Sequence, residues 1–209
     1  MVDNVIFSPR ANLRFNPTQN INLRLSYSSG FRAPQAFDED MHIENVGGTV
    51  AMIERAKDLK EEKSQSFSAS ADMYHRFGAF QTNLLIEGFY TRLTDVFVLG
   101  EPYDRGDGIL VKTRSNGPGA KVMGLTLEGK VAYLSILQIQ AGLTLQRSRY
   151  DEPHKWHDDA PAEKKIFRTP DTYGYFTATC TPIKPLSIAL SGTYTGRMLV
   201  QRMDITAEN

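Results

Sequence analysis

The sequence predicts an all-β protein of antiparallel, up-and-down strands, and three observations support this fold class. Apolar and polar residues alternate with a period of two over stretches of about ten residues, the length that a tilted strand needs to cross a bilayer. The connections between these stretches are alternately short and long. The polar faces carry charged side chains in mid-strand, such as Arg14, Arg24 and Glu128, which suits a wet interior.

The first four predicted strands lie in the N-terminal half of the chain. They cover residues 10–15, 21–28, 66–73 and about 81–98, with short connections near 16–20 and 76–80. In the second stretch Ile21, Leu23, Leu25 and Tyr27 lie opposite Asn22, Arg24, Ser26 and Ser28. In the fourth stretch Leu85 and Phe89 fall among polar positions, so its facing is the least regular.

The last four predicted strands cover about 125–131, 137–146, 173–180 and 186–194. Their short connections lie near 132–135 and 181–185. The long connections span roughly 33–63, 100–119 and 151–168 and are hydrophilic. The pattern therefore predicts about eight strands, with short turns on one rim and long loops on the other. A short helix is expected around Ala51 to Leu59, inside the first long connection.

Composition excludes several other classes of protein. The 209 residues carry a formal net charge of +0, so we expect no nucleic-acid partner. The single cysteine, Cys180, excludes an internal disulfide and a zinc site of paired cysteines. No apolar run is long enough for a transmembrane helix. The residues after Met1 do not form a signal peptide, so an exported protein would begin upstream of them.

Alternation by itself also fits a soluble antiparallel sheet with one wet face. A soluble β-sheet protein that binds a small ligand or a sugar is therefore the alternative. Strand length and the strict alternation of short and long connections favour a membrane barrel. Tyr27 and Tyr194 end the apolar faces of their strands near the long loops, which fits an aromatic girdle, although ordinary cross-strand packing gives the same pattern.

Several short motifs occur in the order in which one family of membrane barrels has them. The second strand ends in Gly30-Phe31-Arg32-Ala33-Pro34, and a proline suits a strand that leaves a sheet because it cannot donate a ladder hydrogen bond. The other matching pieces are Leu59 to Ser64, Gly88 to Asp95, Asn116 with Val122 to Glu128, and Phe167 to Pro170. Glu61 stands where the family often has proline, and Thr126 replaces a glutamate. Together these motifs resemble the barrels of TonB-dependent outer-membrane receptors, with a loop style similar to those of Bacteroidetes.

The resemblance implies a transport receptor of the bacterial outer membrane rather than an enzyme. Such a receptor has a barrel of twenty-two strands, a plug domain that fills the lumen, and a TonB box, and it imports iron–siderophore chelates, haem, cobalamin or glycans. Residues 1–209 are then expected to be an internal portion of the barrel domain, without the plug domain and the final strands. The implied partners are outer-membrane lipid, the plug domain, the TonB complex through the absent N-terminus and a possible surface lipoprotein. No cofactor is implied.

Candidate ligand-binding residues lie in the long loops and on the polar strand faces. We nominate Arg32, Asp38, Asp40, His42 and Trp156. Asp38, Asp40 and His42 belong to an acidic cluster with Glu39 and Glu44. The cluster suits cation binding or simply a solvated loop. His154 and His157 precede two aspartates, and Pro153 and the composition favour a loop there, so the pattern does not predict a metal site. No residues form a recognisable catalytic arrangement.

Overall fold

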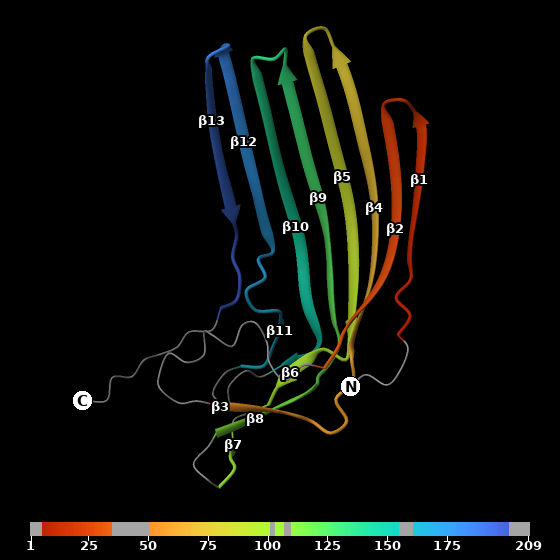
Figure 1. Ribbon diagram of the computed structural model, residues 1–209, viewed down its shortest axis with the longest axis vertical. Coiled ribbons are helices and arrows are strands. Elements are labelled where there is room, and N and C mark those ends of the chain that lie inside the picture. Colours follow the sequence, from red (N-terminus) through yellow and green to blue (C-terminus); the bar gives the residue numbers. More distant parts are fainter. Residues whose placement is uncertain (1–5, 35–50, 101–102, 107–109, 155–160, 201–209) are drawn as a thin grey trace, which may run out of the picture.

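The computed structural model describes residues 6–34, 51–100, 103–106, 110–154 and 161–200. These residues form one large antiparallel sheet and one small sheet (Figure 1). The large sheet contains eight long strands in the order β1-β2-β4-β5-β9-β10-β12-β13, so neighbours in space are neighbours among the long strands of the chain. This up-and-down order confirms the predicted fold class.

All eight predicted strands are present, and most are longer than the alternation suggested. Their bounds are β1 Arg10–Thr18, β2 Ile21–Arg32, β4 Glu62–Phe77, β5 Phe80–Thr94, β9 Ala120–Tyr133, β10 Leu137–His154, β12 Thr172–Ile183 and β13 Leu186–Thr195. The four hairpin turns lie together at one end of the sheet, which we call the turn end, and the long connections lie at the other, the loop end (Figure 1). The predicted fourth stretch is divided, because Asp95 adopts a left-handed conformation with φ 55° and ends β5.

The small sheet lies at the loop end and is built from two of the long connections. It contains β3 (Ala51–Arg55), β6 (Phe97–Leu99), β7 (Tyr103–Asp104) and β8 (Leu110–Asn116). β3 runs parallel to β8, so the first long connection is tied to the second. The prediction of a helix around Ala51 to Leu59 is therefore wrong, because pairing with β8 satisfies the backbone groups that a helix would have satisfied internally. A further short strand, β11 (Glu163–Lys165), pairs with β10.

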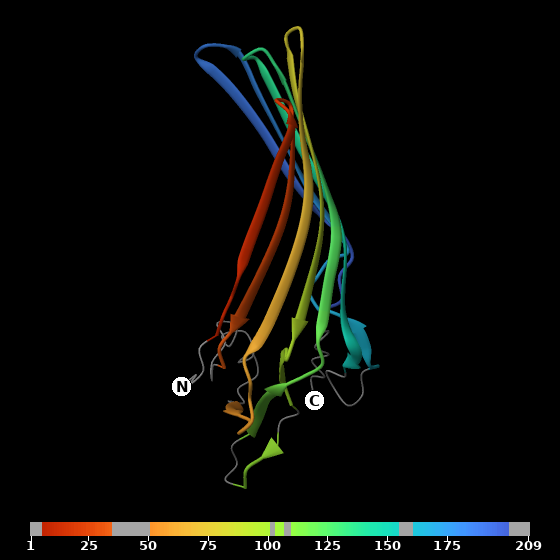
Figure 2. The same ribbon diagram turned by 90° about the vertical axis from the view of Figure 1, so that its right-hand side faces the viewer.

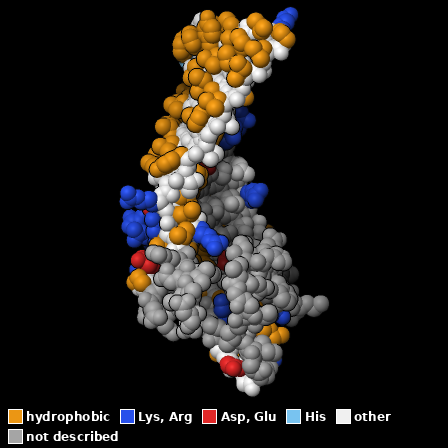
Figure 3. Space-filling view, turned by 90° about the vertical axis from the view of Figure 1, so that its left-hand side faces the viewer, with side chains coloured by type: hydrophobic (Ala, Val, Ile, Leu, Met, Phe, Trp, Pro, Cys, Tyr) orange, Lys and Arg blue, Asp and Glu red, His pale blue; other side chains and the backbone are white. Residues whose placement is uncertain are grey.

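The two faces of the large sheet differ in chemistry, as the alternation predicted. The register places Leu13, Leu25, Ala69, Gly88, Leu125 and Leu145 in one row across six neighbouring strands. This apolar face is open: Leu125 is 49% exposed and Leu127 is 47% exposed. Figure 3 shows hydrophobic side chains gathered along this side of the sheet. Among the described residues Val111 and Ala120 are the only buried hydrophobic ones, so the dry core that a soluble ligand-binding sheet requires is absent there.

Two groups of aromatic side chains mark the limits of the apolar face. At the turn end the rings of Phe77, Phe80 and Tyr133 follow one another, with centroids 5.5 and 4.8 Å apart. Towards the loop end the rings of Tyr27 and Phe67 lie 4.9 Å apart. The Tyr27–Phe67 pair fits both an aromatic girdle and ordinary cross-strand packing, and Tyr194 lies 60% exposed on β13.

The spacing of these groups matches the thickness of a membrane. Tyr133 pairs with Phe80 in the first group, and Met123 of the same strand pairs with Tyr90 at the level of the second. Ten residues of strand cover about 33 Å, and a tilt of roughly 40° reduces this to a height of about 25 Å. That is the height of the apolar band of outer-membrane barrels. None of the described residues form a helix long and apolar enough to span a membrane.

The sheet is bowed and twisted along its length (Figure 2). The polar face tolerates bulky side chains because glycines lie opposite them. Phe89 pairs with Gly124, where an added Cβ would lie 2.6 Å from the Phe89 ring. Tyr175 lies in the same way against Gly142, again at 2.6 Å. The bulky apolar side chain of Phe89 therefore does lie on the polar face, as the irregular alternation of the fourth predicted stretch indicated. Gly124 provides the space for its ring.

Candidate functional site: the polar face and the loop end

The polar face carries hydrogen-bonded side chains in the middle of the sheet, where a lipid-facing surface would carry none. Glu128, Gln140 and Tyr175 come from three adjacent strands and form a closed triangle. Gln140 Nε2 donates to Glu128 Oε1 and to the Tyr175 hydroxyl oxygen, both at 2.8 Å. The Tyr175 hydroxyl donates to Glu128 Oε2 at 2.6 Å. A carboxylate held by two donors shows that this side of the sheet is built for a polar environment.

A second polar group lies nearer the turn end of β4 and β5. Asp72 accepts hydrogen bonds from the Tyr74 hydroxyl at 2.8 Å and from Asn83 Nδ2 at 2.5 Å. On the adjoining strand β2, Arg24 Nε donates to Asn22 Oδ1 at 2.8 Å. The polar face therefore presents both acidic and basic side chains, each fixed by neighbours, and offers a preorganised surface to water or to another protein segment.

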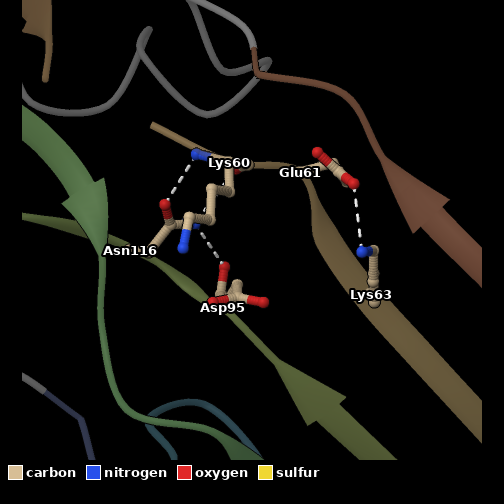
Figure 4. A network of polar contacts seen from close by, with 5 residues as sticks. All are labelled: Lys60, Glu61, Lys63, Asp95 and Asn116. Carbon is tan, nitrogen blue, oxygen red and sulfur yellow. Dashed lines mark hydrogen bonds and ion pairs between the residues drawn. The ribbon is translucent and has the colours of Figure 1, made fainter. Parts of the chain in front are cut away.

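At the loop end one asparagine joins three separate parts of the chain (Figure 4). The Nδ2 group of Asn116 donates to the carbonyl oxygens of Lys60, at 3.0 Å, and Asp95, at 2.8 Å. Its Oδ1 accepts from the backbone N–H of Lys60 at 2.7 Å. We call Asn116 and these two backbone partners the loop clasp. It fixes the end of β8 to the start of β4 and to the left-handed residue that ends β5.

The residues beside the loop clasp extend this junction. Glu62 Oε2 accepts the backbone N–H of Phe97 at 3.0 Å, and the Arg32 guanidinium lies 5.5 Å from the centroid of the Phe97 ring. Glu61 pairs with Lys63, with Nζ 3.1 Å from Oε1. A backbone hydrogen bond within Glu61, followed by the bond from Lys63, lowers the pKa of the Glu61 carboxyl.

A bidentate ion pair joins β5 to β10 near the loop end. Arg92 Nη1 lies 2.7 Å from Asp151 Oδ1, and Nη2 lies 2.6 Å from Oδ2. Lys164 Nζ donates to the backbone carbonyl of Asp151 at 2.9 Å. This pair holds the extended part of β10 against the strand two positions away in the sheet order.

The structure places one of the five nominated ligand-binding residues. Arg32 is the last residue of β2, beside Phe97 and close to the loop clasp. Asp38, Asp40, His42 and Trp156 lie outside the described residues, as do His157 and the two aspartates after it. His154 is the last residue of β10. Within the described part of the chain, no three His, Cys, Asp or Glu side chains are grouped so that they could hold a metal ion.

Sequence reasoning did not identify the junction at the loop end or the triangle around Glu128. The motifs that contain Arg32, Glu62, Asp95 and Asn116 are far apart in the chain, and the fold brings them together in space. Their separation in sequence hides this contact: Asn116 and Lys60 lie 56 positions apart. The signal available in the sequence is that Asn116 directly precedes the turn Gly117-Pro118-Gly119.

A sheet of long strands with an exposed apolar outer band, aromatic limits and a hydrogen-bonded polar face defines a segment of a membrane-spanning β-barrel. The family of TonB dependent receptor-like β-barrels matches residues 2–199. The chain therefore belongs to that family, which consists of receptors and transporters of the bacterial outer membrane. The polar face is accordingly the inner, lumen-facing side, and the apolar face is the outer, lipid-facing side.

Solved receptor structures share this fold. The FrpB iron transporter from Neisseria meningitidis (F3-3 variant) superposes with a TM-score of 0.60 and 18% identity over 90% of this chain and 26% of the transporter. The siderophore receptor PirA from Pseudomonas aeruginosa superposes with a TM-score of 0.62 and 16% identity over 90% of this chain and 34% of that receptor. The alcaligin receptor FauA from Bordetella pertussis superposes with a TM-score of 0.54 and 18% identity over 92% of this chain and 30% of that receptor. The chain thus spans about a third of their length. No curated protein matches by sequence.

Proposed function

We propose that this chain is the internal portion of the barrel of an outer-membrane receptor that actively imports a scarce nutrient. The observation that carries the proposal is the coherent register: every long strand turns its apolar row outward and its hydrogen-bonded polar row inward. The eight strands amount to about a third of a family barrel, in keeping with the share of the solved receptors that they cover. We propose that the plug domain and the final strands are supplied by the rest of the protein.

The charged groups of the inner face support a plug domain as their partner. A lumen filled by a folded plug needs side chains that exchange water for protein hydrogen bonds, and the triangle around Glu128 holds such groups in fixed positions. In this proposal the TonB complex supplies energy through the plug, and a surface lipoprotein is a further partner. Iron–siderophore chelates are supported as cargo by the names of the similar structures, with haem, cobalamin and glycans as the other members of the class.

The ligand is proposed to meet the protein at the loop end. Arg32 projects from the end of β2 beside the junction, and we propose that it contacts an anionic ligand or the plug. Asp38, Asp40 and His42 in the first long connection and Trp156 in the third remain proposed ligand contacts. These residues are proposed as binding groups, not as catalytic ones.

An uptake experiment tests the proposal. In the source bacterium, deleting the reading frame that contains this chain is expected to abolish TonB-dependent uptake of one member of a panel of radiolabelled ferric siderophores, haem, cobalamin and oligosaccharides. Complementation with the intact gene restores uptake, and complementation in a strain without TonB does not. Unchanged uptake of every panel member, with the protein present in the outer membrane of the control strain, would refute a role in import.

A further inference from the structure

A row of basic side chains lies on the outer face, immediately beyond the apolar band on its loop-end side. Arg92 of β5, Lys121 of β9 and Arg149 of β10 pair in register, and Arg147 lies one step nearer the band, opposite Met123. Lys121 shares the face of Leu125, and Arg147 and Arg149 share the face of Leu145, because each is an even number of positions from that leucine on its own strand. Arg92 lies on the same face because it pairs with Lys121. Figure 3 shows Lys and Arg side chains gathered beside the lower end of the hydrophobic band.

The acidic side chains nearby balance only part of this charge. Asp151 is engaged by Arg92 in the bidentate pair, and Asp171 is engaged by Lys165, with Nζ 2.5 Å from Oδ2. Among the described residues no side-chain hydrogen bond or ion pair of Lys121, Arg147 or Arg149 is found, although Lys121 lies close enough to Asp151 to attract its carboxylate. Three cations held close together on one rigid sheet repel one another, so a bound anion stabilises the arrangement.

An apolar groove adjoins these cations. It has a volume of about 1210 Å³, and Arg147 forms part of its wall beside Met123, Leu125 and Leu145. Small residues form part of the groove: at Gly88 an added Cβ would meet nothing within 4 Å, and Ala69 lies beside it in register. The groove faces lipid and is continuous with the hydrophobic band, and it runs across β1, β2, β4, β5, β9 and β10, with three residues of each strand in its wall.

An anion site at one end of an apolar groove fits an amphiphile with a negatively charged head. We propose that the outer face binds a phosphate-bearing lipid of the outer leaflet, with an acyl chain in the groove and the headgroup phosphate at Lys121, Arg147 and Arg149. Phosphate is favoured over a single carboxylate because it offers several oxygens to two guanidinium groups and an ammonium group at once. The outer leaflet is specified because the long loops of this family face the outside. The inference depends on the membrane placement and not on the transport activity.

Lipid retention by the full receptor tests this proposal. The receptor is purified in mild detergent, incubated with bisphosphorylated lipid A, and the retained lipid is counted by native mass spectrometry. The double substitution R147Q/R149Q is expected to reduce retention at least about tenfold. The matched control R76Q/K184Q removes the same charge at the turn end, where Arg76 is the last but one residue of β4 and Lys184 lies in a hairpin turn, and retention is expected to stay unchanged.

Two further arms separate the possible sources of the signal. Asp151→Asn releases Arg92 from its pair and is expected to increase retention, an outcome that loss of folding does not produce. The unsubstituted receptor is expected to retain dephosphorylated lipid A poorly. Its retention should match that of intact lipid A by the R147Q/R149Q variant. Equal retention of the dephosphorylated lipid, an equal loss in the control variant, or complete displacement by inorganic phosphate would each overturn the proposal, the last because it assigns the site to the free ion.

Discussion

A charge placed on the outer face in the middle of the apolar band is the sharpest test of the facing. Leu127 lies between the levels of Met123 and Tyr133 on β9, with 47% of its surface open to the lipid side. Leu127→Arg is expected to destabilise the barrel by about 2–4 kcal/mol, the cost of an arginine near the bilayer midplane. This corresponds to a decrease of roughly 30- to 900-fold in the folding equilibrium constant.

The neighbouring residue on the same strand provides the matched control. Thr126 faces the lumen, where its hydroxyl is hydrogen-bonded to Thr144 at 3.0 Å and Glu87 lies opposite it in register. Thr126→Arg is expected to cost about 1 kcal/mol for the lost hydrogen bond, partly offset by attraction to Glu87. Urea unfolding of the receptor in phospholipid vesicles, followed by far-ultraviolet circular dichroism, measures both variants. Equal destabilisation by the two arginines would refute the assignment of the two faces.

Three other variants test separate parts of the structure. Phe80→Ala removes the stacking against Phe77 and Tyr133 and is expected to cost about 1–3 kcal/mol in the same unfolding assay, whereas Phe80→Tyr is expected to cost little. Asn116→Ala opens the loop clasp and is expected to speed backbone hydrogen exchange at Lys60, with Ser115→Ala as the unchanged control; unaltered exchange contradicts the clasp. The pKa of Glu61, followed by carbon NMR, is expected below that of a free glutamate and to rise in K63Q. A lowered pKa means that the interaction stabilises the fold at neutral pH and is lost as the pH falls through the folded-state value.

The strands were predictable because the same local rule governs every one of them. Leu143 is apolar and its neighbours in sequence are not, and this alternation alone indicates that Leu143 faces lipid. No contact with residues far away in the sequence is needed to predict it. The ends were less predictable. β10 continues to His154, eight residues beyond the last position of the predicted stretch, because β9, β11 and the Arg92–Asp151 pair support polar strand residues outside the membrane.

The small sheet and the loop clasp depend on contacts that sequence periodicity does not encode. Residues 51–55, AMIER, suit a helix by local propensity, yet they become β3 because β8 offers a parallel backbone ladder nearby. The partner comes from another long connection, so only the assembled sheet brings the two together. The Leu59 to Ser64 motif was recognised through resemblance, and its physical reason, the bonds of Lys60 and Glu62, became visible only in the fold.

The loop clasp also has a consequence for how the loops present a ligand-binding surface. Loops joined to barrel strands only by their ends would carry the full freedom of long connections, and ordering them on binding would weaken affinity. Asn116 removes part of that freedom in advance by joining the end of the first long connection, at Lys60, to the start of the second, at Asp95, with three hydrogen bonds. Arg32, beside Phe97 at the same junction, is thereby placed on a rigid base rather than on a free segment. Preorganisation at the base leaves the remaining loop residues free to differ between receptors, while the strands below keep one architecture for all of them.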